Sequence, residues 1–187
     1  MREGWKMKVT KAQAQANRAR IVETASTLFR ERGYDGIGVA DLMGAAGFTH
    51  GGFYKHFESK TDLMAQAARC GIAQTAANTA GVDRNAFVKY YLSRKHRDNP
   101  GEGCTMAALG ADAARQSEQV KEAFAVGIED MLALLALDAG STRAGSIGTL
   151  AHLVGAIVLS RACPEGSPLA DEILRACRSA LLPTAES

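Results

Sequence analysis

The sequence lacks several features that would place the chain in other broad classes. No apolar run reaches membrane-spanning length, and the basic, polar N-terminus has no signal-peptide core. The cysteines are few and widely separated, and they form no CxxC pair or metal-ligand pattern: Cys70, Cys104, Cys163 and Cys177. We therefore expect a cytoplasmic protein without disulfides, with no metal site and no cofactor.

Prolines are also few, four in 187 residues, and no segment has a convincing strand pattern. Apolar residues instead recur at helical spacing along the chain. Helices are expected over residues 11–31, 39–46, 50–56, 61–79, 83–97, 104–116, 117–137, 142–161 and 169–182. The sequence thus predicts an all-α fold of about nine helices.

Neither sign of charge dominates the composition, because the formal net charge is +2. The charge is unevenly distributed, however: residues 1–60 carry a net +4 and residues 61–187 a net −2. This asymmetry predicts a DNA-binding domain over 1–60, with a basic N-terminal arm, and a body over 61–187 that does not touch DNA. A sequence-blind architectural DNA binder would need a far more basic chain.

Two short predicted helices, 39–46 and 50–56, are joined by a tight turn. Gly47 suits a position with positive φ at the end of the first helix, and Thr49 can cap the second. The large apolar side chain of Phe48 is expected to fill the space between the helices. Such a pair is a helix-turn-helix unit, whose second helix enters the DNA major groove.

The second of these helices has an unusual composition. Two glycines inside one helix cost about 1 kcal/mol each relative to alanine, but they allow the backbone to approach DNA closely. Ser59 can cap the next helix, whose free amides would form a phosphate site together with Lys60. The predicted DNA-binding residues are Thr49, His50, Gly51, Gly52, Phe53, Tyr54, Lys55, His56 and Lys60. The alternative is a small surface helix with a few aromatic residues.

The segment from about Asn17 to Leu63 resembles the DNA-binding domain of the TetR/AcrR family of transcriptional repressors. The matching motifs are Ile21-Val22, Ala25, Leu28-Phe29, Gly33-Tyr34, Val39-Ala40-Asp41-Leu42-Met43, Ala46-Gly47-Phe48-Thr49, Gly52-Phe53-Tyr54, His56-Phe57, Ser59-Lys60 and Leu63. The resemblance implies a homodimeric repressor that binds a double-stranded, palindromic operator and is released by a small-molecule inducer. It also implies a non-enzyme with a C-terminal ligand-binding and dimerisation domain.

A second segment, HRDNPGEGC from His96 to Cys104, resembles a subset of TetR-like repressors with an HRDxPxxGC stretch. Cys104 begins a predicted helix, where free amides would favour a thiolate. Two interpretations stay open: a reactive thiol that senses electrophiles or oxidants, and a small buried residue that packs the helix start. A thiol-dependent enzyme using Cys104 with His96 is a third possibility, although no orienting carboxylate or oxyanion motif accompanies the pair.

Apolar and aromatic residues of the body could line a cavity for an apolar ligand, although at helical spacing such residues are more often plain core. The candidate ligand-binding residues are Phe87, Tyr91, His96, Cys104, Met106, Phe124 and Ile128.

The predicted helix 142–161 is apolar on more than one face and rich in small residues, so it must be buried on most sides. With helix 169–182 it is expected to form a four-helix dimer interface, as the family resemblance implies. The predicted interface residues are Ile147, Leu150, Val154, Ile157, Val158, Ile173 and Leu181.

Overall fold

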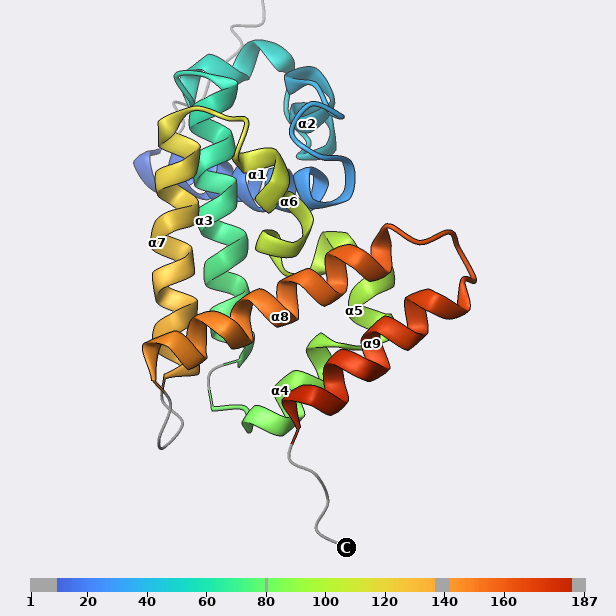
Figure 1. Cartoon of the computed structure of the whole chain (residues 1–187). Helices are drawn as coiled ribbons and strands as arrows, with labels where there is room; N and C mark the ends of the chain where they lie inside the picture. The colour runs from blue at the N-terminus through green and yellow to red at the C-terminus, as the bar shows by residue number, and fades with distance from the viewer. Residues whose placement is uncertain (1–9, 80, 137–141, 183–187) are drawn as a thin grey trace, which may run out of the picture.

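A computed structural model describes residues 10–79, 81–136 and 142–182, and it is helical throughout with no strand in those residues (Figure 1). The α-helices are α1 (Lys11–Arg32), α2 (Val39–Ala45), α3 (Lys60–Thr79), α4 (Arg84–Tyr91), α5 (Arg94–Asp98), α6 (Thr105–Ala113), α7 (Glu118–Leu135), α8 (Arg143–Arg161) and α9 (Pro168–Leu181). Two 3₁₀ segments, η1 (His50–Lys55) and η2 (Pro100–Glu102), complete the described chain. The predicted all-α fold is confirmed. The basic arm before Thr10 and the predicted helix end at Leu137 lie outside the described residues.

The structure differs from the predicted elements at two places. The segment after α2 is a 3₁₀ helix, and two glycines in six residues explain why a regular α-helix is not favoured there. The predicted helix over 83–97 is broken after α4, because Leu92 leaves helical backbone geometry with φ −91° and ψ 47°. Ser93 then caps α5 by accepting a hydrogen bond from the His96 amide at 3.2 Å.

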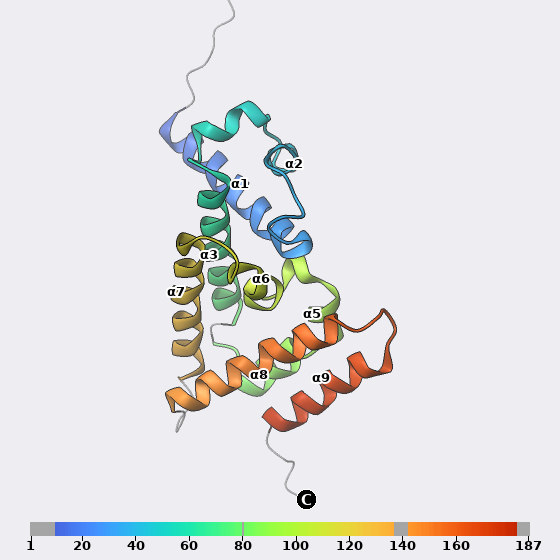
Figure 2. The ribbon, with the colours of Figure 1, turned by 45° about the horizontal axis from the view of Figure 1, so that its top comes forward.

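Two helix packings organise the molecule. Helix α3 lies beside both α1 and α7, and the α3–α7 approach is close because Gly127 has no side chain to meet Ile72. At the other end of the molecule α8 and α9 lie side by side (Figures 1 and 2). The helix-turn-helix unit is at the end of α3 that is far from α9.

The buried apolar side chains form two clusters. One joins α1, α2 and η1 to the first half of α3 and to α7, so the predicted DNA-binding domain shares its core with the body. The other joins α4, α6, α8 and α9 to the end of α7. The boundary predicted at residue 60 therefore lies at the start of a helix that belongs to both units.

Helix α8 is long and apolar enough to cross a membrane by length and composition, with a mean hydropathy of 1.3. The expectation that no segment reaches this threshold was therefore wrong for α8. A third of its most apolar stretch is buried within the chain, where it packs on α6, α7 and α9. The apolar side chains of α8 thus pack within the chain on one side, and on another side Val158 and Leu159 are exposed among the described residues.

Candidate DNA-binding head and ligand pocket

The turn between α2 and η1 has the geometry that its sequence predicts. Gly47 has φ +84°, a conformation that side chains other than glycine rarely adopt. The amide of Phe48 donates to the Met43 carbonyl at 2.8 Å, and this closes the end of α2. Phe48 is half-buried against the core of the head, as expected for a residue that fills the space between two helices.

Two aromatic anchors hold η1 against the core. Phe53 and Phe57 are 1% and 2% exposed, and their ring centroids are 5.5 Å apart. Between them Tyr54 projects outward and is 72% exposed. The prediction that Phe53 contacts DNA is therefore wrong, because its side chain faces the protein core and has almost no surface to offer.

The remaining predicted DNA-binding residues lie mostly on the surface. Thr49, His50, Gly51 and Lys55 are exposed, whereas Gly52 and His56 are half-buried. A Cβ atom at Gly51 would meet nothing within 4 Å, so the backbone there is open to an approaching molecule. The capping role predicted for Ser59 is present: its hydroxyl accepts from the Asp62 amide at 3.1 Å.

Lys60 is oriented differently from the other predicted contacts. Its ammonium donates to the Tyr34 carbonyl at 2.6 Å and lies 6.0 Å from the Phe29 ring centroid. In this conformation the side chain ties the start of α3 to the loop after α1. A phosphate contact from Lys60 would require it to leave that carbonyl.

Arg18 is a positioning residue that the DNA-binding prediction did not include. Its Nε donates to the His56 carbonyl at 3.2 Å, and its guanidinium lies 5.1 Å from the Phe57 ring centroid. Arg18 therefore fixes the end of η1 on α1. The available signal was a basic residue in α1, but no sequence pattern gave its partner 38 positions away.

Four of the predicted ligand-binding residues meet at one cavity of about 370 Å³ between α3 and α4. These are Phe87, Tyr91, His96 and Cys104. Sequence reasoning missed the other lining residues, which are Thr75, Asn78, Thr79, Val82, Tyr90, Glu102 and Gly103. Most are polar or lie in loops, where hydrophobic periodicity gives no signal. We call this space the α4 cavity.

His96 is a buried clamp in the wall of the α4 cavity. Its Nδ1 lies 2.7 Å from the Tyr91 carbonyl and donates to it, while its Nε2 accepts from the Cys104 amide at 2.9 Å. This pattern requires the neutral imidazole. Both nitrogens are thus engaged with the backbone, so His96 cannot act as a base for the Cys104 thiol. The thiol itself is buried, with the residue 3% exposed, and this favours the packing interpretation.

The clamp predicts a pH dependence of stability. Burial lowers the pKa of His96 from its ordinary value of 6.5, partly offset by its bond to Tyr91, and the nearby Arg161 charge lowers it further. As the pH falls below 6.5, the unfolded chain takes up a proton that the folded chain does not bind. The free energy of unfolding should therefore fall between pH 7 and about pH 5.

Urea titrations at several pH values would measure this loss. In His96→Gln the decline should be shallower than in the wild type, whereas the matched change of exposed His50 to glutamine should leave the slope unchanged. Parallel curves for the wild type and His96→Gln would show that His96 does not cause the loss.

Residues 101–104 form a short segment between the head and the α4 cavity, which we call the strap. At one end, buried Arg30 of α1 donates to the Gly101 carbonyl, with its Nε at 2.8 Å. Arg30 also donates to Ser26 Oγ at 2.7 Å and to Thr105 Oγ1 at 3.4 Å. At the other end the Cys104 amide is held by His96. The strap therefore joins the cavity wall directly to a helix of the DNA-binding head.

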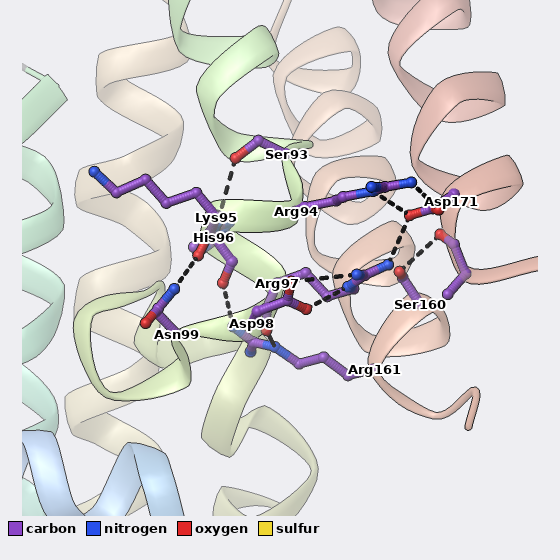
Figure 3. Close-up of polar contacts among 11 residues, drawn as sticks. Ser93, Arg94, Lys95, His96, Arg97, Asp98, Asn99, Ser160, Arg161 and Asp171 are labelled. Carbon is purple, nitrogen blue, oxygen red and sulfur yellow. Dashed lines mark hydrogen bonds and ion pairs between the residues drawn. The ribbon is translucent and has the colours of Figure 1, made fainter. Parts of the chain in front are cut away.

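The arginine of the HRD motif makes a structural contact between helices, and the aspartate pairs with that arginine (Figure 3). Arg97 pairs with the neighbouring Asp98 at 2.6 Å and with Asp171 of α9 at 3.0 Å. Arg94 also pairs with Asp171. From α8, Arg161 donates to the carbonyls of His96 and Arg97 at 2.8 and 2.9 Å. The motif thus ties α5 to α8 and α9.

The other predicted ligand-binding residues line a different space. Met106, Phe124 and Ile128 lie along an open apolar groove of about 470 Å³ between α6, α7 and α8. Three of the predicted dimer residues, Ile147, Leu150 and Val154, line the same groove. The seven candidates therefore divide between two sites, because Met106, Phe124 and Ile128 face α8.

The predicted dimer residues also differ in exposure. Ile147 and Val158 are 47% and 43% exposed, as an interface would require. Val154, Ile173 and Leu181 are half-buried against the second core cluster. Leu150 and Ile157 are 8% and 0% exposed, so their prediction as interface residues is wrong: their side chains pack within the chain. Leu159 of α8, 60% exposed, was not predicted.

Comparisons with known proteins agree with the geometry of the head. The model of the tetR family of bacterial regulatory proteins matches residues 21–67, which cover the second half of α1, the helix-turn-helix unit and the start of α3. Residues 21–67 therefore form a TetR-family DNA-binding head. The match extends seven residues past the boundary predicted at residue 60, in keeping with the shared role of α3.

Curated relatives match the chain in part. The HTH-type transcriptional repressor DhaR of Mycobacterium sp. strain GP1 is 29% identical over 110 residues, 56% of each chain. The regulator TtgR of Pseudomonas putida is 42% identical over 55 residues, which are 29% of this chain and 26% of that protein. The chain thus spans about half the length of the first relative and a quarter of the second.

Solved structures show the same fold over most of the chain. The reduced form of E. coli NemR has a TM-score of 0.72 at 20% identity, covering 89% of this chain and 95% of that one. A TetR-family regulator from Agrobacterium tumefaciens has a TM-score of 0.68 at 21% identity, covering 89% and 98%. Relatives named as regulators support the expectation that the chain is not an enzyme.

Proposed function

We propose that the chain is a homodimeric transcriptional repressor that leaves a palindromic operator when a small molecule binds its body. The observation that carries the proposal is the helix-turn-helix unit, in which buried Phe53 and Phe57 leave the outer side of η1 free. The similarity to DhaR, a transcriptional repressor, supports the proposal.

On DNA, the exposed side of η1 would lie in the major groove. Thr49 and Tyr54 are placed to contact phosphates, while His50 and Lys55 are the polar side chains best placed to meet base edges. The open backbone at Gly51 would admit the duplex closely. His56, half-buried and beside Phe48, contributes less in this arrangement.

The test of this function is a fluorescence-anisotropy titration against DNA from just upstream of the coding region, with random DNA as the control, at one stated salt concentration. Binding to the specific DNA should be tighter by on the order of 10³ or more. Equal affinity for both at every upstream fragment would count against a sequence-specific regulator.

Tyr54→Ala should weaken operator binding about tenfold while the helical content and thermal stability stay unchanged, because the side chain is exposed and its loss removes one contact to DNA. The matched control is Tyr90→Ala, which removes a tyrosine that is 51% exposed outside the head. Anisotropy titrations of both variants would decide the point. Unchanged affinity in Tyr54→Ala would place the DNA contact elsewhere.

The ligand would act through the α4 cavity. A molecule that displaces the strap or the end of α3 changes the position of α1 and α3, and with it the spacing of two heads in a dimer. Such a ligand shifts the equilibrium only by its differential affinity for the two states. The hydrogen bonds from Arg30 to Gly101 and Thr105 connect the strap and the start of α6 directly to α1 of the head.

The exposed apolar side of α8 would be covered by a second copy of the chain. Val158 and Leu159 lie there, and Gly148 and Gly155 leave open space for a close helix partner. A two-fold pair through α8 and α9 places two recognition elements on successive turns of DNA, some 34 Å apart or more. We propose a cytoplasmic location, in keeping with a partner that is DNA.

A further inference from the structure

The α4 cavity combines aromatic walls with a single formal charge. We propose that its ligand is an organic cation with a flat apolar body, and that Glu102 supplies the opposing charge. This inference rests on the proposed ligand-responsive function, because it names the chemical class of the ligand that would act at the cavity.

Four rings lie together in the wall. The Phe87 and Tyr91 centroids are 5.5 Å apart, those of Tyr91 and His96 are 4.4 Å apart, and Tyr90 stacks on His96 at 6.1 Å. The faces of aromatic rings carry partial negative charge and attract organic cations, most strongly where water is excluded. They also offer a flat surface for an apolar ring system.

The charges of the lining residues have one sign. Among the described residues that line the cavity, only Glu102 is formally charged. His96 contributes no positive charge, because its bonds to Tyr91 and Cys104 require the neutral ring. The wall therefore carries a net charge of −1, which favours a cation over a neutral or anionic molecule of the same shape.

The Tyr91 hydroxyl adds no charge to the wall. It is buried and has no nitrogen or oxygen hydrogen-bond partner among the described residues, although it interacts with the Cys104 thiol. Burial raises the pKa of Tyr91, so the group stays a neutral phenol. Tyr91 therefore contributes its ring to the wall and no charge.

Three cations lie near the cavity without lining it. Lys95 and Arg30 line a separate, polar space that shares Tyr90 and Glu102 with the α4 cavity. Arg30 donates to the Gly101 carbonyl, and Arg161 donates to the carbonyls of His96 and Arg97. Among the described residues, Glu102 is therefore the charged residue that lines the cavity itself.

The test uses three bicyclic probes of similar shape and different charge: 1-methylquinolinium, neutral 1-methylnaphthalene and anionic 1-naphthoate. Each is titrated into the full chain and followed by ligand-observed NMR. The cation should bind at least about tenfold more tightly than either of the others. In Glu102→Gln its affinity should fall about three- to tenfold, while binding of the neutral probe stays unchanged.

Glu165→Gln is the matched control, because Glu165 is also exposed and lies outside the cavity lining. Equal affinity for the cation and the neutral probe, tighter binding of the anion, absence of cation binding up to about 1 mM, or equal loss in both variants would each overturn the proposal. The operator titration is independent of these outcomes. Specific DNA binding without a cation preference would reject only the ligand class, and a cation preference without specific DNA binding would reject only the regulator.

Discussion

Arg30→Met should lower the free energy of unfolding by about 2–4 kcal/mol. The guanidinium is buried, with the residue 7% exposed, and it donates to the Gly101 carbonyl, Ser26 and Thr105. Methionine fills a similar volume but donates nothing, so three acceptors lose a charged donor inside the protein. Gly71 of α3 lies directly against the guanidinium, which leaves no room for compensating movement.

Chemical unfolding followed by circular dichroism, at one protein concentration, would measure the loss. Arg32→Met is the matched control, because Arg32 is exposed in the last turn of the same helix and its removal should change stability by less than about 0.5 kcal/mol. The loss of stability in Arg30→Lys should lie between the losses in these two variants. Lysine keeps the charge but cannot donate from two nitrogens to the Gly101 carbonyl as arginine does. Equal stability of the Arg30→Met and Arg32→Met variants would contradict the role assigned to the strap.

Val158→Asp should convert the proposed dimer to monomers and weaken operator binding at least about 100-fold. Val158 is exposed on α8, where an aspartate is well solvated in a monomer but would be buried without a partner in a dimer. Operator affinity falls because two linked heads gain a large effective concentration that a single head lacks.

Size-exclusion chromatography with light scattering gives the mass, and anisotropy gives the affinity. Val126→Asp serves as the control, because this valine of α7 is 57% exposed but outside the α8–α9 face. We expect it to keep the dimer mass and the operator affinity. A dimer mass for Val158→Asp would show that subunits associate through another surface.

Much of the DNA-binding head could be read from the sequence because its signals are local. The turn at Gly47, the cap at Ser59 and the inward spacing of Phe53 and Phe57 depend on residues within a few positions of one another. Backbone conformation and helical periodicity decide such features. The same local signals gave most helix bounds to within one or two residues.

Only the tertiary structure decided which side of each helix is buried and which side stays exposed. Leu150 and Ile157 have the same apolar character as Ile147 and Val158, but the packing of α6, α7 and α9 buries the first pair and exposes the second.

Long-range hydrogen bonds were likewise invisible in the sequence. Arg30 meets Gly101 71 positions away, and Lys60 reaches the Tyr34 carbonyl instead of facing outward. The sequence by itself determined the helices and the family of the head. The cavity, the strap and the free face of α8 follow from how those helices pack, because burial and hydrogen-bond partners are set by neighbours in space.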